Sequence, residues 1–305
     1  MTTRVFSELI NARWDERKFV CVGLDSDRDK IPEAAVRDTD EDTLVYFNSA
    51  IVDATCDLVC AYKPQIAFYE GLGLGGFSAL IRTVSYIHQR APGVPIIGDM
   101  KRGDIGNTNR GYIKAAFEIF NFDAVTVPPY MGKESLKIFL DMKEKSIFVL
   151  CRTSNPGAGE FQDLWVYIRD LPEEVREFFA KLWGIKNDGM EMGHARIPLY
   201  EYVAYRVANQ WNDNNTCSLV VGATCPEELA RVRKIVGDDL PILIPGIGAQ
   251  GGDLEPAVKY GMSERKKDAI FNSSRAIIFG SSGSDFPEVA RQKTIELHSK
   301  VNSYL

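Results

Sequence analysis

Two aspartates bracket a lysine in the segment Asp99-Met100-Lys101-Arg102-Gly103-Asp104, which follows the apolar residues 94–98. A short apolar run rich in β-branched residues is typical of a buried strand. Side chains two residues apart in a strand point to the same face, so extended geometry as far as Lys101 would place Asp99 beside Lys101. Neighbouring carboxylates favour the ammonium form of a lysine, so the segment predicts a proton donor or a cation rather than an amine nucleophile.

The rest of the chain supplies the elements that would position this segment. Strand-like runs alternate with amphipathic helical stretches, a pattern typical of a parallel sheet covered on both faces. Eight repeats in roughly 250 residues predict a (β/α)8 TIM barrel, whose chemistry lies at the carboxyl ends of the strands. The expected strands are residues 19–24, 57–62, 94–98, 122–127, 146–150, 217–222, 240–244 and 269–273. The expected helices include residues 42–55, 76–90, 109–120, 226–236 and 255–261, with an extra N-terminal helix over residues 4–15.

The connection between the fifth and sixth expected strands, residues 156–216, is unusually long. It contains helical patterns over residues 164–183 and 199–211, with a Gly-rich stretch between them. No Pro/Ser-rich linker marks a boundary. We therefore expect one barrel domain spanning residues 1–305, with residues 156–216 as a helical insert after strand 5.

Composition narrows the class of protein. The formal net charge of -6 and the pI of about 5.3 argue against nucleic acid or an anionic membrane as the main partner. No apolar run approaches the roughly 18 residues of a membrane span, and the N-terminal residues lack the hydrophobic stretch of a signal peptide. The six cysteines form no C-x-x-C pair. We expect reduced, buried thiols and a cytoplasmic location.

Charged residues follow several of the expected strands. Asp25 follows the first, Lys63 the second, and Asp99 with Lys101 the third. Exposed ion pairs contribute only about 0–1 kcal/mol, but apolar strands would direct these side chains into a shared cleft. A functional cluster is therefore favoured over a purely structural ion network, which remains the alternative.

The loops after strands 7 and 8 are suited to an anion. Residues 245–253 are Gly-rich and include Gly251, and Arg275 follows the last strand. Small residues let backbone N–H groups approach a phosphate, and an arginine adds a bidentate charge. We expect a phosphate monoester on the ligand. The alternative is that these glycines only form a tight turn.

Two competing sites are less favoured. Residues 71–76 match G-x-G-x-x-G, which is typical of dinucleotide binding, but residues 64–70 separate the motif from its strand. We expect a flexible loop beside the barrel mouth instead. His88, His194 and His298 follow no expected strand, and no His/Cys/carboxylate cluster has metal-ligand spacing, so no metal site is predicted.

The pattern D-x-K-x-x-D-I-x-x-T at residues 99–108, with Asp25 and Lys63 upstream, resembles the orotidine 5′-phosphate decarboxylase family. Residues 153–156, which include Ser154, and residues 245–253 extend the resemblance, which is closest to the longer branch with an insert after strand 5. Related Mg²⁺-dependent sugar-phosphate barrels, including keto-gulonate-phosphate decarboxylases and hexulose-phosphate synthases, share the D-x-K-x-x-D core. The Ser154 loop and the Gly-rich loop favour the pyrimidine enzyme.

The resemblance implies cofactor-free decarboxylation of orotidine 5′-phosphate to UMP, the last step of de novo pyrimidine synthesis. It implies that Lys101 protonates C6 of the pyrimidine as CO₂ leaves, and that Asp99 lies near the substrate carboxylate. Whether Asp99 repels that carboxylate or anchors Lys101 is open. The remaining implied roles are ribose binding by Lys63 and Asp25, ring contact by Ser154, and phosphate binding by Gln250, Gly251 and Arg275. Asp104 and Thr108 would enter the neighbouring subunit's site, which implies a homodimer.

Three alternatives stand beside this function. The first is a Mg²⁺-dependent sugar-phosphate decarboxylase or lyase on the same barrel. The second is a nicotinamide-binding oxidoreductase that uses residues 71–76. The third is a protein that binds a nucleotide phosphate without catalysis.

Overall fold

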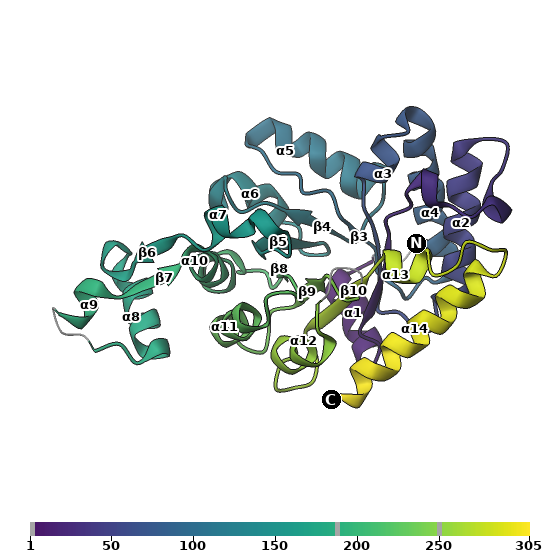
Figure 1. Cartoon of the computed structure of the whole chain (residues 1–305). Helices are drawn as coiled ribbons and strands as arrows, with labels where there is room; N and C mark the ends of the chain where they lie inside the picture. Colours follow the sequence, from purple (N-terminus) through teal and green to yellow (C-terminus); the bar gives the residue numbers. More distant parts are fainter. Residues whose placement is uncertain (1–3, 187–189, 249–251) are drawn as a thin grey trace.

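The computed structural model describes residues 4–186, 190–248 and 252–305. Within them, eight parallel strands form one sheet with helices around it (Figure 1). The strands are β1 (Val20–Leu24), β2 (Ala61–Pro64), β3 (Ile97–Gly98), β4 (Ala124–Val127), β5 (Ser146–Arg152), β8 (Cys217–Val221), β9 (Ile242–Pro245) and β10 (Ala269–Ser273). Their order is β2-β1-β10-β9-β8-β5-β4-β3, and parallel bridges from Tyr62 to Ile96 and from Gln65 to Asp99 close the ring. The expected (β/α)8 TIM barrel is confirmed.

Burial on both faces explains why the strands are continuous apolar runs. Every residue of β1, β4, β8 and β10 is buried. Such strands carry no polar alternation, because helices cover one face and the barrel interior the other. The second strand differs from the expected residues 57–62. The chain turns after α2, where the Leu58 N–H donates to the Thr55 carbonyl at 2.9 Å, and the strand begins only at Ala61. Lys63 therefore lies within β2 rather than after it.

The helices that surround the sheet include several with clear sequence signals. Thr39 caps α2 by accepting a hydrogen bond from the Asp42 N–H at 3.0 Å. Residues 71–76 are not the flexible loop that we expected: α3 ends at Glu70, and α4 begins at Gly73, where φ is +62°. The barrel helices are α1 (Phe6–Asp15), α2 (Asp40–Thr55), α3 (Ala67–Glu70), α4 (Gly73–Arg90), α5 (Gly106–Ile113), α6 (Gly132–Leu140), α11 (Pro226–Val236), α12 (Leu254–Gly261), α13 (Arg275–Ile278) and α14 (Phe286–Ser303). Short 3₁₀ turns η1 (Arg28–Lys30) and η2 (Glu33–Ala35) precede α2, and a π-helical segment, η3 (Lys114–Ile119), extends α5.

The chain between β5 and β8 forms its own small elements. They are η4 (Pro156–Ala158), α7 (Gly159–Gln162), β6 (Trp165–Tyr167), η5 (Ile168–Asp170), α8 (Glu173–Trp183), α9 (Glu191–His194), β7 (Arg196–Pro198), α10 (Leu199–Arg206) and η6 (Val207–Trp211). Figure 1 shows α7 and α10 beside the barrel strands, and β6, β7, α8 and α9 extending away from them. The expected helix over residues 164–183 is wrong in its first half. Aromatic and β-branched residues of β6 pair antiparallel with β7, and Pro172 immediately precedes α8.

The N-terminal helix α1 packs against the amino-terminal end of the barrel. Phe6, Ile10 and Trp14 are buried, and the Phe6 and Phe148 rings pack in a T-shaped arrangement with their centroids 5.7 Å apart. Arg4, just before α1, is paired with Asp123, which immediately precedes β4. Across residues 4–186, 190–248 and 252–305, no helix combines the length and apolar character needed to cross a membrane.

Candidate active site

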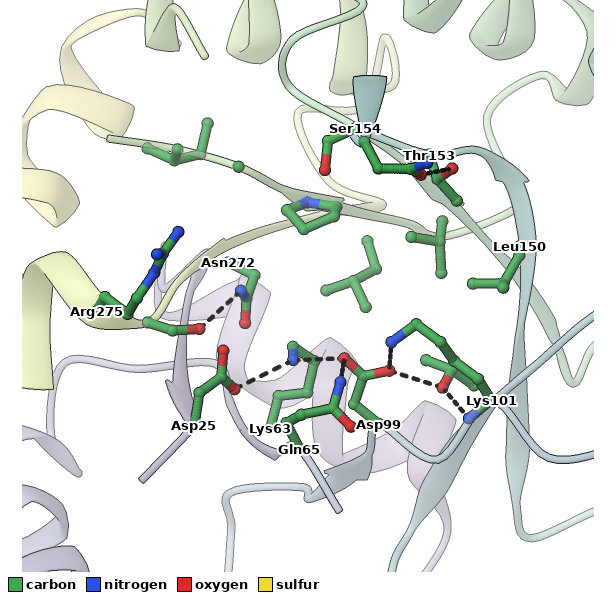
Figure 2. A pocket seen from close by; sticks show the side chains of 18 of the residues that line it. Asp25, Lys63, Gln65, Asp99, Lys101, Leu150, Thr153, Ser154, Asn272 and Arg275 are labelled. Carbon is green, nitrogen blue, oxygen red and sulfur yellow. Dashed lines mark hydrogen bonds and ion pairs between the residues drawn. The ribbon is translucent and has the colours of Figure 1, made fainter. Parts of the chain in front are cut away.

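A cavity of about 520 Å³ lies at the carboxyl ends of the barrel strands (Figure 2). Its residues come from most of the strands, because the carboxyl ends of all parallel strands meet at one end of a barrel. The charged side chains that line it are Asp25, Lys63, Asp99, Lys101 and Arg275. Most of the polar residues expected at strand ends are therefore brought together.

Acids and bases alternate along one wall of this cavity. Lys63 Nζ lies 2.8 Å from Asp99 Oδ2 and 3.8 Å from Asp25 Oδ1. Lys101 Nζ lies 2.6 Å from Asp99 Oδ1. Figure 2 shows the resulting row, Asp25–Lys63–Asp99–Lys101. Each ammonium group thus has a carboxylate beside it.

This arrangement keeps Lys63 and Asp99, which are both buried, in their charged forms. Burial disfavours the Lys63 ammonium, but Asp99 and Asp25 outweigh it and raise the pKa of Lys63 above its ordinary value. Burial also disfavours the Asp99 carboxylate, but Lys63 and Lys101 lower the pKa of Asp99 well below its usual range. At neutral pH Asp99 is therefore an anion, and Lys63 is a fixed cation that cannot accept a proton.

Lys101 reaches Asp99 by a turn rather than by extended geometry. Strand β3 ends at Gly98, and the Met100 N–H donates back to the Gly98 carbonyl at 3.0 Å. Lys101 has φ of +50°, in the left-handed region. A non-glycine residue in this region costs about 1–3 kcal/mol and persists where its surroundings hold it. The expectation of an extended strand as far as Lys101 is thus wrong, although the two side chains still meet.

Two further side chains, neither of which was predicted from the sequence, hold Asp99. Gln65 Nε2 donates to Asp99 Oδ2 at 3.0 Å, and Thr126 Oγ1 donates to Asp99 Oδ1 at 2.9 Å. Thr126 is a lone polar residue inside the apolar strand β4, which is the signal that could have found it. Together with Lys63 and Lys101, these residues give Asp99 four donors.

The opposite wall includes the loop after β5. Gly222 packs against this loop at Ser154. A Cβ atom at position 222 would lie only 2.8 Å from Ser154 Cα, so the close approach of the two backbones requires a glycine there. Gln162 Nε2, at the end of α7, donates to Thr153 Oγ1 at 2.9 Å and lines the cavity. The chain between β5 and β8 therefore contributes directly to the cavity through Gln162, which was not among the predicted site residues.

Groups suited to binding a polar ligand lie at the end of the cavity opposite Lys101. Figure 2 shows Arg275 and Lys101 at opposite ends of the cavity. Arg275 is exposed and forms no ion pair with any described residue. Within the described chain, Asp25 Oδ1 and Asn272 Oδ1 are buried and accept no hydrogen bond, although Lys63 Nζ lies 3.8 Å from Asp25 Oδ1. Gln250 and Gly251 lie outside the described residues.

Asp104 and Thr108 do not line the cavity of their own chain. The Asp104 N–H donates to Asn109 Oδ1 at 2.8 Å, and Asp104 Oδ1 accepts from the Ile105 N–H at 2.7 Å. Thr108 is exposed on α5. Among the predicted site residues that the structure describes, these two are the ones that do not line the cavity.

The described residues of the cavity are not arranged as a metal-binding site. Within the described ranges, no group of three or more His, Cys, Asp or Glu side chains is arranged to hold a metal ion. Lys63 Nζ occupies the space between Asp25 and Asp99. An ammonium at this place repels a divalent cation.

Comparisons with known proteins agree with this geometry. The model of the "Orotidine 5'-phosphate decarboxylase / HUMPS family" matches residues 18–283. A curated orotidine 5'-phosphate decarboxylase from Cellvibrio japonicus is 41% identical over 295 residues, which cover 97% of each chain. Its counterpart from Cupriavidus metallidurans is 43% identical over 300 residues, 98% of each chain. The solved structure of Leishmania donovani OMP decarboxylase has a TM-score of 0.76 at 32% identity, with 98% of each chain covered. The chain belongs to the orotidine 5'-phosphate decarboxylase / HUMPS family.

Proposed function

We propose that this chain decarboxylates orotidine 5′-phosphate to UMP and CO₂ in pyrimidine nucleotide synthesis. The observation that carries the proposal is the charge row, in which the Lys101 ammonium is held 2.6 Å from Asp99 on the wall of the cavity. The names of the curated relatives, which match almost the whole chain, support the same substrate.

The reaction needs a positioned cation more than a covalent catalyst. The bond between C6 and the carboxylate breaks, CO₂ leaves, and the electron pair stays on C6 in the plane of the ring. Lys101 Nζ donates a proton to C6, forming the C–H bond of UMP, and the neutral amine then regains a proton from water. A fixed ammonium stabilises the developing charge and delivers the proton without a cofactor as electron sink.

Asp99 serves in this proposal to anchor Lys101. Both of its carboxylate oxygens accept hydrogen bonds from neighbouring side chains, which fixes their orientation. Asp25 and Lys63 bind the ribose hydroxyls, and Ser154 contacts the pyrimidine. Arg275, with Gln250 and Gly251 of the Gly-rich loop, binds the phosphate at the far end. Binding energy from the phosphate then contributes at the reacting carbon.

A homodimer completes the site in this proposal, with Asp104 and Thr108 contributed by the neighbouring subunit. Neither residue lines the cavity of its own chain, as this arrangement requires. Exposed apolar side chains precede α5 and α6, the neighbouring helices that follow β3 and β4: Ile105 is 58% exposed and Tyr130 is 92% exposed. Both side chains are therefore available to contact a partner chain.

We also propose one domain, residues 1–305, with residues 156–216 as an insert. Gln162 ties the insert to the cavity wall. A cytoplasmic location is supported by the six free cysteines, five of which are buried.

The test is UMP formation from orotidine 5′-phosphate by the purified protein in excess EDTA. We expect full activity with EDTA and no increase when Mg²⁺ is restored. No turnover under either condition would contradict the proposal.

A second candidate is Mg²⁺-dependent sugar-phosphate chemistry, because the family description also names HUMPS members. It predicts no activity on orotidine 5′-phosphate and Mg²⁺-dependent turnover of a ketose or keto-acid phosphate. The Lys63 ammonium between Asp25 and Asp99 favours the first candidate.

A further inference from the structure

One hydroxyl group is hydrogen-bonded both to the backbone of Lys101 and to the carboxylate that holds its ammonium. Thr126 Oγ1 accepts a hydrogen bond from the Lys101 backbone N–H at 3.0 Å. The same oxygen donates its proton to Asp99 Oδ1 at 2.9 Å, and that carboxylate oxygen accepts from Lys101 Nζ at 2.6 Å. Thr126 therefore fixes the backbone of Lys101 directly and its ammonium through Asp99.

The hydrogen-bonding capacity of the hydroxyl makes these contacts specific. A threonine hydroxyl has one proton to donate, and here Asp99 takes it. Its lone pairs remain for the Lys101 N–H. Thr126 is 2% exposed, so water does not readily replace either partner. A valine at this position would keep the shape of the side chain and lose both bonds.

Lys101 needs such support because little else holds it. Strand β3 has ended, and the residue lies at φ of +50°. Its side chain is 47% exposed and carries the ammonium on a flexible four-carbon stem. Misplacement of a reacting group by about 1 Å can cost about 100-fold in rate.

We propose that Thr126 is a positioning residue for the proton donor: its hydroxyl joins the left-handed turn at Lys101 to the carboxylate that aims the ammonium. This inference rests on the proposed function. It adds a residue of β4 to the catalytic apparatus without requiring that Thr126 touch the substrate.

The experiment compares Thr126→Val, Thr126→Ser and wild type by steady-state turnover of orotidine 5′-phosphate in EDTA. Loss of the hydroxyl should lower kcat about 10- to 100-fold, as expected for a misplaced reacting group, and change KM by less than about 3-fold. Serine, which retains the hydroxyl, should restore kcat to within about 5-fold of wild type. Thr126→Ala serves as a second hydroxyl-free variant if the valine variant does not fold.

A matched control separates positioning from packing. Thr294 in α14 is fully buried, and its hydroxyl donates to the Ala290 carbonyl at 2.7 Å, away from the cavity. Thr294→Val should retain wild-type kcat while losing a similar amount of thermal stability. Unchanged kcat in folded Thr126→Val, equal losses in the serine and valine variants, or a loss confined to KM would each overturn the inference. Those outcomes leave the proposed function standing if wild type turns over, whereas an inactive wild type would overturn both.

Discussion

Asp99 and Asp123 are two buried carboxylates near neighbouring strands, at opposite ends of the barrel. Asp99 follows β3 at the carboxyl end of the strands, which we call the mouth, and Lys63 and Lys101 flank it there. Asp123 precedes β4 at the amino-terminal end of the strands, which we call the floor. It accepts hydrogen bonds from Arg4 Nε at 2.9 Å, from Arg4 Nη2 at 2.8 Å and from the Ile96 N–H at 3.0 Å. Both clusters join an acid to several bases, yet only the first lines the cavity of the candidate active site.

The difference lies in what each cation can do. Arginine side chains are not proton donors in proteins, and the planar guanidinium fork of Arg4 holds the Asp123 carboxylate by two hydrogen bonds. Lys145 is also near Asp123, but its Nζ donates to the Phe122 carbonyl at 2.8 Å. At the mouth, Lys101 extends from a turn at the cavity wall and its side chain is half exposed. The ion pairs at the floor thus hold parts of the fold together, whereas those at the mouth hold Lys101 for the proton transfer that we propose.

The largest expected effect is the loss of the mouth lysine. Lys101→Ala should lower kcat about 10⁴-fold, because it removes the proton donor. The matched control is Lys145→Met, which removes the lysine beside Asp123 and should leave kcat within about 2-fold of wild type. Steady-state UMP formation by folded samples measures both. More than about 10% residual kcat in Lys101→Ala would show that proton transfer does not depend on this lysine.

Subunit complementation gives the next largest change. Lys101→Ala and Asp104→Ala should each be nearly inactive alone, because every homodimeric site lacks one residue. After co-refolding in equal amounts, random pairing gives one intact site in each mixed dimer, so activity should recover to about a quarter of wild type. Mixing without refolding is the control. No recovery in verified mixed dimers would show that Asp104 acts within its own chain.

The floor cluster should affect stability instead of rate. Asp123→Asn removes the charge paired with Arg4 and should lower the free energy of unfolding by about 3 kcal/mol. Chemical denaturation measures that loss, and kcat at 25 °C should stay within about 2-fold of wild type while the protein is folded. A large fall in kcat without loss of stability would place Asp123 in the catalytic apparatus and remove the contrast between the two ends.

A smaller effect concerns acid sensitivity. Burial, with Arg4 nearby, lowers the pKa of His88 from 6.5 to about 4, although Asp123 partly opposes this. The unfolded chain then binds a proton that the native chain does not, so stability should fall as pH drops from about 6.5 to about 4. Asp99, whose pKa is also lowered, should lose its stabilising contribution only below about pH 4.

Thermal unfolding between pH 4 and pH 7 tests this assignment. His88→Gln should flatten the decline in Tm over that range, and His194→Gln, an exposed histidine of α9, should not. Equal curves for His88→Gln and wild type would remove His88 as the source of acid sensitivity.

The convergence of charged side chains at the mouth was predictable from the sequence, because it follows from the topology of a parallel barrel. Parallel strands bring their carboxyl ends together, so apolar runs followed by Asp25, Lys63 and Asp99 were sufficient to predict convergence. The contacts of Gln65 and Thr126 with Asp99 depend on strand register, which apolar runs do not define. The turn at Lys101 was also missed, because a short segment does not show where extended geometry ends.

The floor and the insert were less predictable, for different physical reasons. Asp123 stands within the expected strand of residues 122–127, and its partner Arg4 lies 119 positions away. The insert hairpin depends on pairing between Val166 and Ile197, whereas the local periodicity of residues 164–183 favours a helix. In both cases the deciding contact is distant in sequence.

The most direct test of the catalytic account is a crystal structure of the protein with UMP bound in the presence of EDTA. We predict that C6 of the pyrimidine lies about 3–3.5 Å from Lys101 Nζ, the separation expected of reacting atoms. The phosphate should contact Arg275, and Asp104 of the neighbouring subunit should reach the ribose. A nucleotide whose C6 lies far from Lys101, with another group facing that carbon, would contradict the account.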